Sequence, residues 1–136
     1  MITSLLAKSS PKRAFLLLAL LTMSLVYATV ISDVMIEEYK SEAARPFTIE
    51  AGFETWTAVQ PNGRSCNTCH GESLHIAGSH QKTGKRIEAM APSVNPDRLT
   101  SRKKINKWFL RNCKWTYGRE CTAQEKGDIL LWLSQL

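Results

Sequence analysis

Apolar side chains recur at helical spacing in four segments of the chain, which are residues 33–44, 48–59, 99–112 and 122–136. A residue that commonly caps a helix stands at or near the start of each segment: Asp33, Thr48, Thr100 or Ser101, and Thr122. Thr122 is followed three positions later by Glu125, and together they form a capping box. The pattern therefore predicts a mostly α fold, and the length suits a single domain over residues 33–136.

The segment at residues 99–112 has the most regular apolar face. Ile105, Trp108 and Phe109 fall at offsets of 0, 3 and 4, and Asn112 follows at offset 7, so the four share one side of the helix. The asparagine interrupts an otherwise apolar face, and a buried amide needs a polar partner. The other faces carry the bases Arg102, Lys103, Lys104, Lys107 and Arg111.

The first two segments indicate how the helices pack. Val34, Ile36 and Tyr39 offer the first helix a partial apolar face. In the second, Gly52 lies four positions before Trp56, on the same face. A glycine inside a helix costs roughly 1 kcal/mol relative to alanine, so it indicates close contact with another element, unless the helix begins after it.

Two connecting stretches are predicted to be irregular. Residues 71–99 have little periodicity and hold turn-forming residues that include Gly78, Gly84, Pro92 and Pro96. A loop of this length is unusual in a small domain, but it is expected where the loop lies against a bound cofactor. Residues 113–121 are predicted to form a short loop around Gly118.

The N-terminal segment has the features of an export signal. Residues 1–13 hold three bases and no acid, and residues 14–31 carry no charge. Val26 and Ala28 suit a signal peptidase, which favours a signal peptide at residues 1–28. The competing interpretation is an uncleaved anchor to about residue 31, because 18 uncharged residues approach the length of a membrane span. We expect a periplasmic protein, with a membrane-anchored form as the alternative.

Charge is unevenly distributed along the chain. The formal net charge is +6 at pH 7, but three of the bases belong to the export signal, so nucleic-acid binding is not indicated. Residues 33–54 hold six acids and two bases, whereas residues 98–114 hold seven bases and no acid. The basic run is either a solvated helix face or a surface that steers an acidic redox partner.

Candidate chemistry is concentrated at Cys66, Cys69 and His70. A Cys-x-x-Cys-His run is typical of c-type haem attachment. The two thiols can form thioethers to one haem c, and His70 then supplies an axial nitrogen to the iron. A structural zinc ion would need four ligands, and the chain has no second Cys-x-x-Cys pair. A redox pair would need a βαβ context, which the pattern does not predict.

Cys113 and Cys121 remain once the haem has taken the other two cysteines. In an oxidising compartment they are expected to form a disulfide rather than to stay free. Closing a loop this short would stabilise the fold by roughly 2.5 kcal/mol on the chain-entropy account.

The iron ligand opposite His70 has several candidates. Met90 is the first, because small c-type cytochromes commonly use a methionine from a loop after the motif. His75 and His80 lie in the same polar loop, where histidines are more often solvated or bonded to the backbone. Asn112 is the fourth candidate, although its spacing slightly favours an amide that bonds to water or to the backbone.

Four ordered blocks of the chain resemble one family of small bacterial cytochromes c. They are SCNTCHG, TGKRIEAMAPSVNPDRL, INKWFLRNC and GRECTAQEKGDILLWL, and they span residues 65–133. They are similar to the sphaeroides-type haem protein family, whose members bind oxygen. The resemblance implies a class I cytochrome c-like fold with one covalent haem and a long haem-wrapping loop. The helix with Gly52 and Trp56 also resembles the N-terminal helix of class I cytochromes c more generally. That helix crosses the C-terminal helix, which would set Gly52 and Trp56 against Ile129 and Trp132.

The resemblance also ranks the candidate iron ligands. The family uses the asparagine directly before a disulfide-bonded cysteine, which corresponds here to Asn112 followed by Cys113. Met90 stands where related members have an apolar residue, so methionine ligation remains the alternative. An amide oxygen suits ferric iron better than ferrous iron, so reduction would release Asn112 and let O2, NO or CO bind.

These features predict a monohaem cytochrome that transfers electrons in the periplasm and is not an enzyme. The resemblance implies a redox partner protein, with a dihaem cytochrome c as the electron donor. The alternative function is an ordinary six-coordinate carrier with His70 and Met90 on the iron and no gas binding. A small oxidase or an NO-handling enzyme ranks third, because no carboxylate-histidine pair in the sequence favours it.

Overall fold

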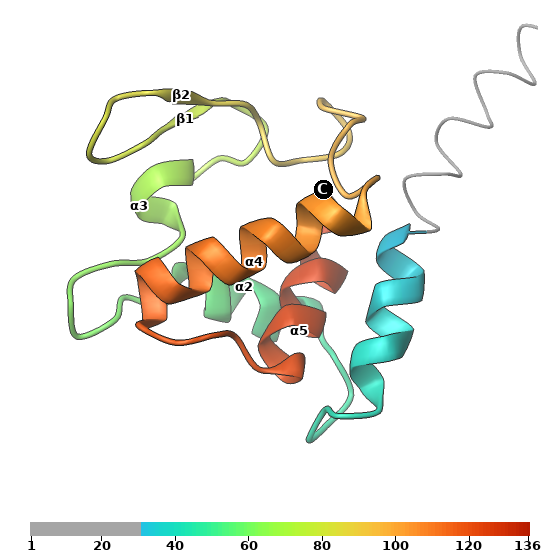
Figure 1. Cartoon of the computed structure of the whole chain (residues 1–136). Coiled ribbons are helices and arrows are strands. Elements are labelled where there is room, and N and C mark those ends of the chain that lie inside the picture. Colours follow the sequence, from blue (N-terminus) through green and yellow to red (C-terminus); the bar gives the residue numbers. More distant parts are fainter. Residues whose placement is uncertain (1–30) are drawn as a thin grey trace, which may run out of the picture.

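The computed structural model describes residues 31–136, which are mostly helical (Figure 1). A helix over residues 31–40 comes first. It is followed by α2 (Ile49–Thr57), α3 (Asn67–His70), β1 (Gly78–Ser79), β2 (Arg86–Ile87), α4 (Arg102–Tyr117) and α5 (Ala123–Leu133). In Figure 1, α4 crosses the middle of the molecule, with α3 and the two strands to its upper left and α2 and α5 behind and below it. The predicted mostly α fold class is confirmed.

The predicted signal peptide, residues 1–28, lies outside the described residues. Within residues 31–136, every helix is too short or too polar to cross a membrane.

The helix over residues 31–40 packs against the core through Met35 and Ile36, which are buried, and through Tyr39, which is half-buried. Val34 was predicted to share this face, but it is exposed, because side chains two positions apart point to different sides of a helix. The helix ends four residues before its predicted end. Its last turn tightens through a bond from the Ala43 N–H to the Lys40 carbonyl, of the short type that often closes a helix.

The core is built on the crossing of α2 and α5. Gly52 is buried at the crossing, where a Cβ atom would lie 2.2 Å from the carbonyl oxygen of Asp128 and 2.6 Å from the Cβ of Trp132. The ring of Trp132 also contacts Phe53 and Trp56, at centroid distances of 5.7 and 5.6 Å. The predicted contact of Gly52 and Trp56 with the last helix is therefore confirmed, and it requires a residue without a side chain.

A buried carboxylate ties this crossing to the segment before α2. Asp128 accepts hydrogen bonds from the Thr48 N–H at 2.9 Å, from Arg45 at 3.0 Å and from Gln124 at 3.0 Å. The Thr48 hydroxyl in turn accepts from the Ala51 N–H at 3.1 Å and caps α2, as predicted. The start of α2 is thus fixed both by its own cap and by α5.

The helix α4 starts as predicted but ends later than predicted. Ser101 caps its start, and its hydroxyl accepts from the Lys104 N–H. The helix continues to Tyr117, so the prediction of a loop over residues 113–121 is wrong for its first five residues. Gly118 ends the helix in the left-handed conformation, with a φ of 71°, which is the usual glycine stop. The predicted capping box of Thr122 and Glu125 then starts α5.

Residues 71–99 are largely irregular, as predicted, but they contain a short antiparallel hairpin that the sequence did not indicate. Gly78 pairs with Ile87, and Ser79 pairs with Arg86. The hairpin lies directly against α3, since a Cβ atom on Gly78 would be 2.2 Å from the carbonyl oxygen of Cys69.

Candidate functional site

A single helical turn presents the residues of the Cys-x-x-Cys-His motif together. The Thr68 hydroxyl accepts from the Ser65 N–H at 3.0 Å, and the His70 N–H donates to the Cys66 carbonyl at 3.2 Å. Residues three and four positions apart share a helix face, so Cys66, Cys69 and His70 lie on one side of the turn. Both cysteines are free and half-buried. The arrangement suits two thioethers to one haem with an imidazole beside them.

The His70 side chain lies against α2, with its ring centroid 5.1 Å from that of Trp56. Burial, followed by the positive charge of Arg98, lowers the pKa of His70 to about 4. The imidazole is therefore neutral at physiological pH, which is the form that binds a metal.

The Cys66 thiol differs from the thiols of a redox-active pair. Burial raises the pKa of the Cys66 thiol to about 12, although a hydrogen bond with Thr116 opposes the shift. Reactive cysteines have a lowered pKa and a positive environment. Cys66 therefore does not match a dithiol that exchanges disulfides, and thioether attachment is the interpretation that agrees with its setting.

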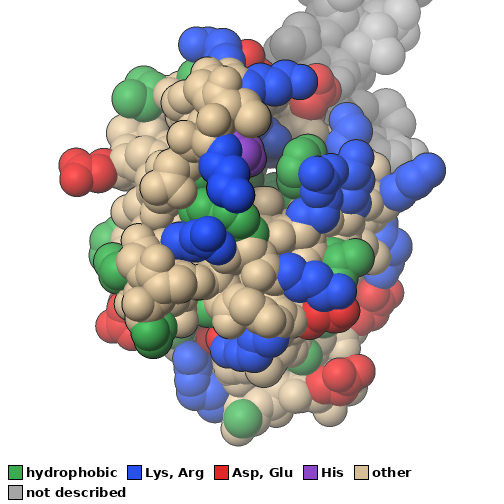
Figure 2. All heavy atoms as spheres, turned by 60° about the vertical axis from the view of Figure 1, so that its left-hand side comes forward, with side chains coloured by type: hydrophobic (Ala, Val, Ile, Leu, Met, Phe, Trp, Pro, Cys, Tyr) green, Lys and Arg blue, Asp and Glu red, His purple; other side chains and the backbone are tan. Residues whose placement is uncertain are grey.

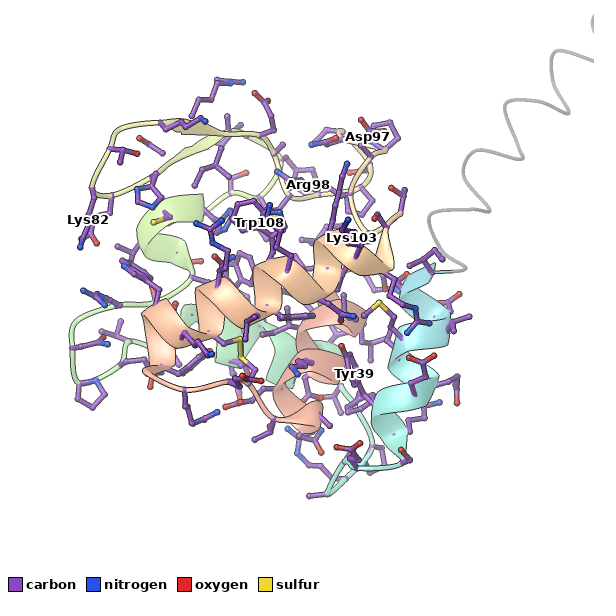
Figure 3. The ribbon with its side chains drawn as sticks, viewed as in Figure 1. Tyr39, Lys82, Asp97, Arg98, Lys103 and Trp108 are labelled. Atoms are coloured by element: carbon purple, nitrogen blue, oxygen red, sulfur yellow. A yellow bond between two sulfur atoms is a disulfide. The ribbon has the colours of Figure 1, made fainter. Side chains whose placement is uncertain are left out.

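The helix α4 presents the asparagine candidate. Asn112 is exposed, and its side chain makes no hydrogen bond with any residue of the range 31–136. Trp108, one turn earlier on the same face, is 46% exposed. Figure 3 shows Trp108 reaching from α4 toward the loop that carries Arg98. The amide of Asn112 is thus on the face of α4 that is turned toward this loop.

The other ligand candidates are placed differently. Met90 is half-buried and packs against the hydrophobic core, and its N–H donates to the Leu74 carbonyl at 2.9 Å. Its side chain therefore has a packing role in the protein fold. His75 and His80 are both exposed.

Several polar groups on this side of the molecule fit a haem. The indole N–H groups of Trp56 and Trp115 are buried without an acceptor among the described residues. Arg98 is half-buried and donates to the carbonyls of Glu88 and Ala89, with no carboxylate paired to it in residues 31–136. Buried donors and cations of this kind call for an acceptor or an anion. Haem propionates are both.

The surface over this region is hollowed. Figure 2 shows a histidine side chain within a hollow that is bordered by basic and apolar side chains. The helix α4 makes much less contact with α2, α3 and α5 than α2 and α5 make with each other. A haem is an apolar ring with two anionic propionates, so it matches a hollow bordered by apolar and basic side chains. The residues present therefore fit the haem that the motif implies.

Cys113 and Cys121 form the predicted disulfide, with their Cα atoms 5.5 Å apart. Both cysteines are buried. Because α4 continues to Tyr117, the bridge joins its last turns to the start of α5 instead of closing a loop directly after Asn112. It therefore fixes the helix backbone on which Asn112 stands.

Removing this bridge should destabilise the haem-loaded protein by about 2.5 kcal/mol, because the unfolded chain regains the freedom of the closed loop. The variant is Cys113→Ala/Cys121→Ala, and the measurement is urea unfolding followed by far-UV circular dichroism. Thr122→Ala, which removes only the cap of α5, should cost about 1 kcal/mol and serves as the comparison. A double variant as stable as the parent would show that the bridge adds nothing.

Sequence reasoning identified the motif residues but not Trp115 and Arg98. Trp115 lies seven positions after Trp108, so recognising Gly118 as the stop of α4 would have placed it on the same face. Arg98 stands in an irregular loop, where no periodicity reveals the direction of a side chain.

Comparisons with known proteins show the family of this chain. Residues 42–133 match a family model described as a domain of unknown function, DUF1924. The chain is 41% identical over 104 residues to the cytochrome c-type protein SHP of Cereibacter sphaeroides, covering 74% of this chain and 80% of that protein. It is 32% identical over 75 residues to cytochrome c'' of Methylophilus methylotrophus, covering 54% and 52%.

Solved structures give the same relationship. Oxidised SHP, described as an oxygen-binding cytochrome c, matches with a TM-score of 0.71 and 38% identity over 77% of this chain and 96% of that one. Oxidised cytochrome c'' from Methylophilus methylotrophus matches with a TM-score of 0.66 and 25% identity over 77% and 94%. The resemblance and the cytochrome c-like fold are confirmed. This chain therefore belongs to the SHP family of c-type cytochromes.

Proposed function

We propose that this cytochrome carries electrons through one covalent haem c, with His70 and Asn112 as axial ligands in the ferric state. Asn112 is released on reduction, and O2, NO or CO can then bind. The observation that carries the proposal is the Asn112 amide, which has no partner among the described residues and directly precedes the bridged Cys113. Haem c supplies the one-electron chemistry and the coordination site.

The residues on the α3 side hold and orient the group. Cys66 and Cys69 tether it, and His70 donates a nitrogen lone pair from an imidazole whose ring is positioned by Trp56. The Trp115 indole N–H on α4 is a donor available to an anionic acceptor such as a propionate.

Asn112 has the properties of an iron ligand that is lost on reduction. Its amide oxygen is a hard, weak ligand that prefers ferric to ferrous iron, whereas a thioether such as that of Met90 is soft and binds ferrous iron well. The disulfide fixes the backbone next to Asn112, so release needs only rotation of its side chain. Two relatives support this behaviour: SHP is described as oxygen-binding, and the solution structure of cytochrome c'' addresses haem-ligand detachment.

We also propose a cellular setting for the electron transfer. The pattern of residues 1–28 supports export to the periplasm, with a membrane-anchored form as the alternative. There the protein would exchange electrons with a redox partner protein, and a dihaem cytochrome c is the candidate donor.

The reduced protein should be five-coordinate and should bind CO rapidly, because Asn112 no longer competes for the iron. Absorption spectra of the dithionite-reduced protein give the coordination number, and stopped-flow mixing with CO gives the rate. The ferric protein should not respond to CO and serves as the control. A low-spin ferrous spectrum that CO leaves unchanged would contradict the proposal and would indicate permanent ligation by His70 and Met90.

A further inference from the structure

The C-terminal end of α4 is capped by side chains from the segment that leads into the haem motif. The last four carbonyls of an α-helix have no partner within the helix. In α4, the Trp115 carbonyl accepts from the Arg64 guanidinium at 2.9 Å. The Thr116 carbonyl accepts from the Asn62 amide at 3.0 Å. Arg64 and Asn62, here termed the helix clamp, lie 51 and 54 positions away from these carbonyls, so the clamp is a tertiary contact and not part of the local stop at Gly118.

The charge of Arg64 is directed at α4. Its Cζ lies 4.6 Å from the centroid of the Trp115 ring, and it forms no ion pair with a carboxylate in residues 31–136. A cation is favourable at the C-terminal end of a helix, where the helix dipole is negative. A planar guanidinium can bind a carbonyl and lie over an aromatic ring at the same time. The half-buried Arg64 makes both contacts with one residue of α4.

The clamp stands on a turn that is closed by its own hydrogen bonds. The Gln60 N–H donates to the Arg64 carbonyl at 2.8 Å, and the Arg64 N–H donates to the side-chain oxygen of Asn62 at 3.0 Å. Cys66 follows two residues later, and its N–H donates to the Trp56 carbonyl at 3.2 Å. A displacement of α4 from the clamp is therefore also a displacement from the residue that would tether the haem.

Asn112 stands one helical turn before the clamped carbonyls. The opposite end of α4 is fixed elsewhere, because Arg102 pairs with Glu38 and the side chain of Asn106 accepts from the Tyr39 hydroxyl at 3.4 Å, both on the first helix. The clamp thus relates the backbone of Asn112 to the segment that carries the haem motif.

We propose that Arg64 and Asn62 are positioning residues for Asn112, which hold α4 at the distance from α3 at which the Asn112 amide reaches ferric iron. The proposal rests on the ferric ligation by Asn112 proposed above and adds two residues that act through the helix backbone. An amide oxygen is a weak ligand, so a small displacement of its backbone lets another ligand replace it. The clamp therefore acts on the population of the Asn112-ligated form.

Two variants loosen the clamp in steps. Arg64→Gln removes the cation and shortens the side chain, so the affinity of the ferric, haem-loaded protein for added imidazole should rise at least about fivefold. Arg64→Gln/Asn62→Ala lacks both bonds and should raise it at least about tenfold. The ferric electron-spin spectrum of both variants should shift toward that of Asn112→Ala. An imidazole affinity that is unchanged in the double variant would overturn the proposal.

Arg119→Gln is the matched control. Arg119 stands just beyond the end of α4, and its Cζ lies 5.4 Å from the centroid of the Tyr117 ring. It donates to the Glu120 carbonyl and to the Glu125 carboxylate instead of to carbonyls of α4. The same substitution with the same change in charge should leave the imidazole affinity within about twofold of the parent. An equal rise in the Arg64 and Arg119 variants would assign the effect to net charge and refute the clamp.

A second control separates positioning from stability. Thr122→Ala removes the cap of α5 and lowers the urea midpoint without touching the clamp. Its imidazole affinity should stay within about twofold of the parent, because Asn112 keeps its place. If this variant raises the affinity as much as Arg64→Gln does, the affinity follows the stability of the fold, and the proposal is wrong.

The Asn112→Ala background tests whether the clamp acts through Asn112. There, Arg64→Gln should change the imidazole affinity by less than about twofold, since no internal ligand remains to be positioned. A rise as large as in the parent would show that the clamp controls access to the iron, which refutes positioning. If Asn112→Ala alone leaves the ferric affinity unchanged, ferric ligation by Asn112 fails and the positioning role fails with it. If Asn112→Ala raises the affinity but Arg64→Gln/Asn62→Ala does not, only the positioning role fails.

Discussion

Replacing Asn112 by alanine should raise the affinity of the ferric protein for added imidazole by at least about tenfold, because an internal ligand no longer competes for the iron. The ferric absorption and electron-spin spectra should change at the same time. Spectral titration with imidazole measures the affinity directly. The same substitution should leave CO binding by the reduced protein within about twofold of the parent, since the amide is already released in that state.

Met90→Leu is the matched variant. It keeps the volume and apolar character of a half-buried side chain, so a core packing role tolerates it. The ferric spectrum and the imidazole affinity should stay as in the parent. If the methionine variant changes the ferric spectrum and the Asn112 variant does not, then Met90 is the sixth ligand and the role of Asn112 in other family members does not extend to this chain.

Replacing Gly52 by alanine should destabilise the protein by about 3 kcal/mol or more. Helix propensity alone predicts the opposite sign, because alanine is better than glycine inside a helix by about 1 kcal/mol. The added Cβ, however, would meet the Asp128 carbonyl oxygen at 2.2 Å, and a backbone atom of a packed helix cannot turn aside. The helices α2 and α5 would have to separate, and the contacts of Trp132 with Trp56 and Phe53 would be lost.

Urea unfolding of the haem-loaded protein measures this effect, with Gly84→Ala as the comparison. Gly84 has open space around it but a φ of +64°, so alanine there should cost about 1 kcal/mol of backbone strain only. A Gly52 variant that is more stable than the parent would mean that the two helices do not cross as closely as described.

The parts of the fold that sequence predicted are those fixed by local chemistry. Thr48, Thr122 and Glu125 act within one turn of their own position, so their caps are visible without any tertiary information. The predicted end of α4 comes too early although Gly118 is also a local signal, because an expected disulfide between Cys113 and Cys121 favours a loop between them. The hairpin at Gly78 depends on contact with α3, and no short sequence pattern predicts it.

The candidate site divides in the same way. Cys66, Cys69 and His70 are adjacent in sequence, so one motif identifies them and one helical turn assembles them. The opposite side draws on α4, where residue spacing alone leaves Asn112 one candidate among four. Its unpartnered amide becomes visible only when the neighbours of each side chain are known. Trp115 and Arg98 belong to the same class. Among the described residues, the Trp115 indole has no acceptor and Arg98 has no ion-pair partner, and only the folded structure reveals either fact.

The uneven packing of the helices affects how fast different parts of the fold open. The helices α2 and α5 pack closely against each other, whereas α4 packs less closely against either of them. The helix α4 is tied to its surroundings by Arg102 and Asn106, which bind side chains of the first helix, by the Cys113 bridge, and by the Tyr117 hydroxyl, which donates to the Thr55 carbonyl at 2.7 Å. Segments with fewer packed neighbours open locally while the rest of a protein stays folded. Local opening of α4 would let a ligand enter and leave the site while α3 stays in place. The residence time of a gas in this cytochrome would then follow the opening rate of one helix.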